Sequence, residues 1–103
     1  MVRGTTAIFT ILITDSTVAL TELSALAVTF SQNGHTVIER SLNEVTIDTS
    51  NKTITIAFTQ KETLRFKDGK VELQVALKYT TGQVIRSEIM TTTAERILKD
   101  GEI

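Results

Sequence analysis

Nine consecutive residues in the C-terminal half of the chain alternate between apolar and mostly polar side chains. The apolar positions are Val71, Leu73, Val75, Leu77 and Tyr79, and the positions between them are Glu72, Gln74, Ala76 and Lys78. Successive side chains of a β-strand point to opposite faces of a sheet, so this pattern predicts a strand with one buried face. Because that face needs a second layer to cover it, the rest of the chain must supply one.

The composition favours further strands as that layer. Threonine occupies 19 of the 103 positions, and proline, cysteine and tryptophan are all absent. β-Branched side chains such as threonine fit the half-buried surface of a sheet. The length is typical of one domain, so we expect residues 1–103 to form a single unit.

Alternation and turn signals together predict about seven strands. Residues 7–14 are apolar on both faces, which favours a central strand. Residues 15–22 form a connection or one helical turn, and residues 94–99 either continue the last strand or form a short helix. Thr59 and Glu62 have the spacing of a capping box, which predicts a short helical turn there. The seven expected strands are residues 7–14, 25–32, 35–41, 44–48, 53–58, 71–79 and 84–93.

Three short loops predict tight hairpins between these strands. Asn33-Gly34 is typical of a two-residue type I′ turn, and Gly82 suits the left-handed position of a three-residue loop at residues 80–82. A symmetric loop at residues 49–52 joins the fourth and fifth strands. The expected cross-strand pairs are Val37 with Phe30, Ile47 with Ile54, Val45 with Ile56, Leu77 with Ile85, and Leu73 with Ile89.

One-sided strands of this number predict an all-β fold, an antiparallel β-sandwich that is immunoglobulin-like in size and strand count. A closed barrel is the alternative. The absence of a core tryptophan and of a cysteine pair excludes an antibody-type domain but not this architecture.

Residues suited to catalysis or metal binding are scarce, so we expect no enzyme, no metal and no cofactor. The single histidine, His35, follows the Asn33-Gly34 turn, where it should be exposed and without partners. Only Glu39 and Asp48 are candidate co-ligands for it, whereas a metal site needs three or four converging ligands. Asp15, Asp48 and Asp68 lie near turns, where carboxylates accept backbone hydrogen bonds.

The charge pattern favours neither nucleic acid nor a membrane as partner. The net charge is −1, and the one basic cluster is interleaved with acidic residues, as on a solvated face. No apolar run is long enough for a membrane span, and residues 1–6 lack the order of a signal peptide. We therefore expect the chain to be cytoplasmic on synthesis. The basic cluster is Lys61, Arg65, Lys67 and Lys70, interleaved with Glu62, Asp68 and Glu72.

Several stretches, in order and over nearly the whole chain, resemble a group of small proteins found in Firmicutes prophages. None of them carries a catalytic motif, and the resemblance assigns no binding residue. The members of this group are mostly of unknown function, and the resemblance implies a virion-associated accessory protein of the tail or baseplate type. The matching stretches are residues 3–6, 28–34, 42–48, 58–66, 71–75 and 95–101.

Two classes of function follow from these observations. The first is a structural subunit or adaptor that binds other phage particle proteins or itself. The second is a free-standing binding module for a host protein or a surface carbohydrate. Sugar sites normally present aromatic platforms, and Tyr79 is the only tyrosine here, which favours assembly. The uncharged runs at residues 7–13 and 90–94 are the expected edges for self-association or docking.

Overall fold

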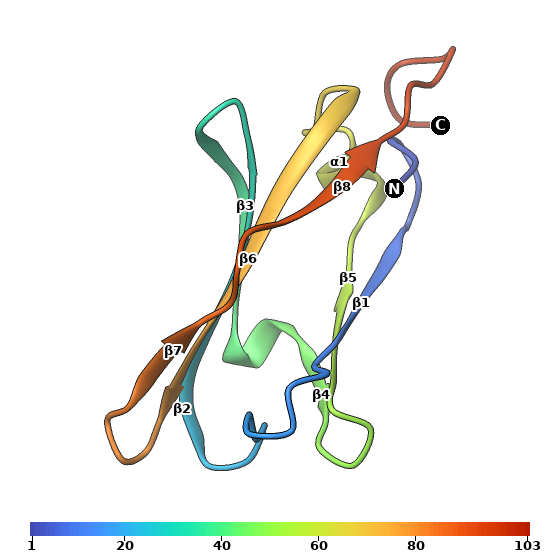
Figure 1. The fold of residues 1–103 in the computed structure, drawn as a ribbon. Coiled ribbons are helices and arrows are strands. Elements are labelled where there is room, and N and C mark those ends of the chain that lie inside the picture. The colour runs from blue at the N-terminus through green and yellow to red at the C-terminus, as the bar shows by residue number, and fades with distance from the viewer.

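Two antiparallel sheets make up the computed structural model of the chain, which describes residues 1–103 (Figure 1). The three-stranded sheet has the order β1-β5-β4, with β1 at Ile8–Leu12, β5 at Thr53–Ala57 and β4 at Thr46–Asp48. The five-stranded sheet has the order β3-β2-β6, with β7 and β8 sharing the other side of β6. Its strands are β3 (His35–Ser41), β2 (Leu23–Gln32), β6 (Gly69–Tyr79), β7 (Val84–Arg86) and β8 (Met90–Ala94). The predicted all-β sandwich is confirmed.

The inward faces of the two sheets share one hydrophobic core. Val28 and Phe30 of β2 and Val75 of β6 are buried, as are Ile54 and Ile56 of β5 on the other sheet. The predicted burial of Val71, Leu73, Val75 and Leu77 is confirmed, whereas Lys78 is exposed.

Four phenylalanines form the centre of this core. The Phe30 ring packs edge-to-face against Phe9, Phe58 and Phe66, with centroids 5.7, 5.2 and 6.3 Å away. Such T-shaped pairs match the negative face of one ring to the positive edge of another. Phe9 lies in β1 and Phe30 in β2, Phe58 directly follows β5, and Phe66 follows α1, so the four rings join both sheets.

Local turn chemistry fixes the hairpins as the sequence predicts. Asn33 and Gly34 both have positive φ, 52° and 78°, as a type I′ turn requires, and Gly82 has φ 92°. The helical turn α1 (Gln60–Thr63) begins with the predicted capping box, in which Thr59 Oγ1 accepts from the Glu62 N–H at 3.2 Å. A second capping box, at Ser41 and Glu44, starts the 3-10 turn η1 (Leu42–Glu44), which the sequence analysis did not predict.

The structure decides between the two interpretations of residues 7–14. The apolar pattern favoured a central strand and the lack of charge favoured a docking edge, and β1 pairs only with β5 and is an edge strand. The central strand of its sheet is β5. Apolar residues on both faces of β1 therefore do not reflect burial on both faces, because Ile8 and Leu12 are largely exposed.

Irregularities shift two predicted pairs by one residue. A bulge between Phe30 and Ser31 places Ile38, not Val37, opposite Phe30. Leu73 faces Met90, not Ile89, because the expected last strand is broken into β7 and β8 around residues 87–89. That break raises the number of strands from about seven to eight. The predicted pairs of Ile47 with Ile54 and of Leu77 with Ile85 are confirmed.

The remaining segments are irregular. Val45 precedes β4 and so has no strand partner, contrary to its predicted pairing with Ile56. Residues 95–99 form no helix, and residues 15–22 form a connection with a turn. No helix in the structure is long and apolar enough to cross a membrane.

Candidate docking edge

The backbone of β1 is hydrogen-bonded on one side only. Ala7 O accepts from the Phe58 N–H and the Ile13 N–H donates to Lys52 O, both at 2.9 Å. Hydrogen-bonded positions alternate along an antiparallel pair, so the odd-numbered residues 7–13 direct their N–H and C=O groups towards β5. The same groups of Ile8, Thr10 and Leu12 point away from the sheet, and no hydrogen bond joins them to another part of the chain.

The outward side chains of β1 belong to the same three residues. Ile8 is 71% exposed, Leu12 is 61% exposed, and Thr10 between them is also exposed. Phe9 and Ile11, on the other face, pack into or against the core. The strand thus offers solvent an unpaired backbone and two apolar side chains at once.

No charge protects this edge. Between Arg3 and Asp15 the chain has no ionisable side chain and no proline, and β1 has no bulge. Native proteins usually guard an exposed edge strand with charges, proline or a bulge, because an unguarded one pairs with other chains. We call residues Ile8–Leu12 with their outward backbone groups the β1 edge.

The other sheet edges are guarded or covered. β4 has only three residues and ends in Asp48, and β3 carries Glu39 and Arg40. The uncharged strand β8, the other edge expected from the sequence, is covered at one end by the N-terminal residues (Figure 1). There the Met1 ammonium donates to Thr93 O, and Met1 O accepts from Glu95 N, both at 2.8 Å.

A mainly apolar groove of about 600 Å³ opens beside the β1 edge. It lies between the end of β1 with its following loop and β6, β7 and the residues before β8. Its floor includes Val75 and Leu77 of the core, and its walls include Ile13, Val18 and Ile85. Eight of its 14 lining residues are hydrophobic, and its charged lining residues are Asp15, Arg86 and Glu88.

The residues considered for metal binding do not converge. His35 is exposed at the β2–β3 hairpin, as predicted, and Glu39 lies further along the same strand. Asp48 lies at the end of β4, where it accepts hydrogen bonds from its own loop. No group of three or more histidine, cysteine, aspartate or glutamate side chains is placed to hold a metal ion.

Two of the predicted turn carboxylates do bind backbone amides. Asp48 accepts from the Asn51 N–H at 3.1 Å and from the Ser50 hydroxyl at 2.8 Å, and these bonds lower the pKa of its carboxyl. Asp15 accepts from the hydroxyl and the N–H of Thr17, which lowers its pKa in the same way. Both carboxylates therefore shape their own loops.

The residues of the basic cluster lie on the surface. Lys61, Arg65, Lys67 and Lys70 are all exposed, and none forms a salt bridge. Such an arrangement is the solvated face that the sequence predicts.

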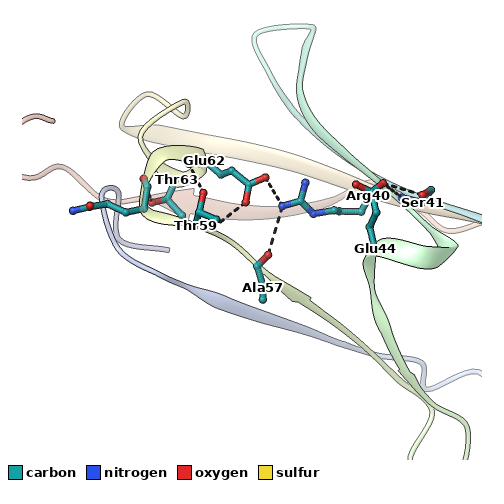
Figure 2. A network of polar contacts seen from close by, with 8 residues as sticks. Arg40, Ser41, Glu44, Ala57, Thr59, Glu62 and Thr63 are labelled. Carbon is teal, nitrogen blue, oxygen red and sulfur yellow. Dashed lines mark hydrogen bonds and ion pairs between the residues drawn. The ribbon is translucent and has the colours of Figure 1, made fainter. Parts of the chain in front are cut away.

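A polar network joins the two sheets on the side of α1 (Figure 2). Arg40 of β3 pairs with the Glu62 carboxylate, and its guanidinium lies 5.4 Å from the centroid of the Phe58 ring. Burial raises the pKa of Glu62, but the Thr59 N–H and the Arg40 guanidinium lower it by more, so the net pKa is below its usual range. All groups in this network have protein partners, which makes it a structural clamp rather than a reactive centre.

The uncharged run at residues 7–13 was a candidate docking edge in the sequence, although its apolar pattern also favoured a central strand. The signal for an edge was the absence of charge from residue 4 to residue 14, because exposed edge strands usually carry charges. Comparison with family models, with curated proteins and with solved structures gave no match. The resemblance to prophage proteins stays a prediction.

Proposed function

We propose that this chain is a non-enzymatic assembly module of a phage-type particle, an accessory protein of the tail or baseplate type that becomes virion-associated after cytoplasmic synthesis. The observation that carries the assembly role is the β1 edge, with unpaired backbone groups and two exposed apolar side chains. The assignment to a phage particle rests on the sequence resemblance.

Strand addition is the binding mode that fits this edge. An incoming strand would satisfy the outward groups of Ile8, Thr10 and Leu12 and cover their side chains. The groove beside the edge would accept apolar side chains of the same partner. Among the edge strands, β1 is the one with neither a charged residue nor a covering segment, which suits it to strand addition.

A carbohydrate site has less support. The Tyr79 hydroxyl donates to Ala19 O at 2.6 Å, and the ring is partly buried against the core. The four phenylalanine rings pack into or against the core. No aromatic side chain is therefore free to act as a platform for a sugar ring.

Particle fractionation tests the proposal. Particles are sedimented after induction of the lysogen that carries the gene and are probed with an antibody against the chain. We expect the wild-type chain and Thr46→Lys, on the opposite edge of the same sheet, in the particle fraction. The Leu12→Lys protein should stay in the supernatant and be absent from the particle fraction. Absence of the wild-type chain from purified particles would refute the proposal.

A further inference from the structure

We propose that two copies of this chain pair antiparallel through the β1 edge, around a two-fold axis at Thr10. This inference names the first partner of the proposed assembly module and rests on that role. Pairing would join the two three-stranded sheets into one continuous sheet with the order β4-β5-β1-β1-β5-β4.

The backbone restricts the possible registers. Only even-numbered residues of β1 present their N–H and C=O groups outwards, so two copies can exchange hydrogen bonds only between Ile8, Thr10 and Leu12 and their counterparts. With the axis at Thr10, Thr10 faces Thr10 of the second copy, and Ile8 faces Leu12 twice. Every outward apolar side chain then meets another apolar side chain.

Neighbouring registers are poorer. An axis at Phe9 places Ile8 opposite Thr10 and Leu12 opposite Thr6. An axis at Ile11 places Leu12 opposite Thr10 and Ile8 opposite Thr14. Each of these shifts exchanges two apolar cross-strand contacts for contacts with threonine, which stabilise a sheet less.

Charge does not oppose the pairing. Arg3 and Asp15 flank the uncharged run, but Arg3 is paired with Asp100 and Asp15 accepts hydrogen bonds from Thr17. No ionisable side chain therefore lies between the two β1 strands. A second copy complements this edge in backbone and side chains, and the pairing around a two-fold axis is isologous and closed.

Cysteine crosslinking tests the register, because the chain has no cysteine of its own. Opposed residues of a hydrogen-bonded pair have Cα atoms about 5.5 Å apart, within the range of a disulfide. We expect Thr10→Cys to form a covalent dimer on oxidation. Leu12→Cys alone should not form a covalent dimer, since the two substituted residues at position 12 of the dimer would lie roughly 14 Å apart. A mixture of the Ile8→Cys and Leu12→Cys proteins should crosslink, because residues 8 and 12 face each other.

Failure of Thr10→Cys to crosslink at near-millimolar concentration would overturn the inference, as would equally efficient crosslinking of Leu12→Cys alone. Circular dichroism of each variant is the control that checks whether these substitutions at exposed positions leave the fold intact.

Light scattering on a size-exclusion column gives the second readout. Because the contact is only five residues long in each copy, we expect a weak dimer whose mass approaches twice 11.3 kDa between micromolar and near-millimolar concentration. Leu12→Lys should stay monomeric, and Thr46→Lys should dimerise like the wild type. A wild-type protein that stays monomeric at every concentration would overturn the dimer, as would a dimeric Leu12→Lys. Neither result would bear on docking to other particle proteins, which the fractionation experiment tests.

Discussion

Arg40 of β3 and Glu62 of α1 form an ion pair that ties the five-stranded sheet to the segment following the three-stranded one (Figure 2). The side chains are 12% and 24% exposed, so the pair is shielded from much of the solvent. The Glu62 carboxylate also accepts from the Thr59 N–H at 2.9 Å, and so the same group closes the capping box of α1. One carboxylate thus holds both a local turn and the contact between the sheets.

Removal of the arginine should therefore destabilise the sandwich. We expect Arg40→Ala to lower the free energy of unfolding by about 1–3 kcal/mol, because it leaves the shielded Glu62 without its charged partner and uncovers the Phe58 ring. Urea denaturation measures this loss. Lys61→Ala, exposed on the same turn, is the matched control and should change stability by less than about 0.5 kcal/mol. Equal effects of the two substitutions would contradict the clamp.

The same pair predicts how stability depends on pH. The pKa of Glu62 is lowered in the folded chain, so the stability it contributes is present above the pKa of the unfolded state and is lost as pH falls through the folded value. Glu62→Gln should be less stable than the wild type at neutral pH. The difference should begin to narrow below about pH 4.5, where the glutamate of the unfolded chain takes up a proton, and should be lost once the folded carboxyl is also protonated. Urea midpoints of both proteins across this range test the sign, and a widening gap at low pH would contradict it.

The register of β6 is tested by substitutions on its two faces. Leu73→Ala and Val75→Ala remove buried side chains and should each cost about 2–4 kcal/mol. Lys78→Ala, on the exposed face of the same strand, should cost less than about 0.5 kcal/mol. If thermal melts showed a larger loss of stability for Lys78→Ala than for Leu73→Ala and Val75→Ala, the assignment of the buried and exposed faces of β6 would be wrong.

The sequence was most informative where local chemistry decides the structure. The alternation from Val71 to Tyr79, the Asn33-Gly34 turn and the Thr59 capping box each depend on neighbouring residues, and each is found as predicted. It was less informative where the outcome depends on distant segments. The bulge after Phe30 moves one predicted pair by one residue. The break at residues 87–89, where Ser87 Oγ accepts from the Val75 N–H of the neighbouring strand, moves another.

The candidate docking edge shows the same limit. An apolar run such as residues 7–13 is compatible with a buried central strand and with an exposed edge, and only the strand order separates the two. That order places β5, not β1, in the middle of the sheet. The unpaired backbone of β1 therefore follows from the strand order, whereas Ile8 and Leu12 are exposed because they lie on the sheet face away from the core.

A buried hydroxyl anchors the chain just before β1. Thr63 Oγ1 donates to Thr5 O at 2.8 Å and accepts from the Thr5 N–H at 3.1 Å, and the Thr63 side chain is fully buried. Thr63→Val keeps the shape of the side chain but leaves both backbone groups of Thr5 without this partner. We expect a loss of about 1–3 kcal/mol in the free energy of unfolding, because unsatisfied polar groups in a shielded site are costly.

Hydrogen exchange locates that loss. The Thr5 amide should exchange faster in Thr63→Val than in the wild type. Amides of the central strand β6 should exchange faster only by the amount that the lower free energy of global unfolding accounts for. Thr46→Val, an exposed threonine on β4, is the control for the same chemical change and should leave the Thr5 amide as protected as before. Unchanged protection of Thr5 in Thr63→Val would mean that the backbone pairing of Met1, Arg3 and Ala7 holds this segment without the hydroxyl.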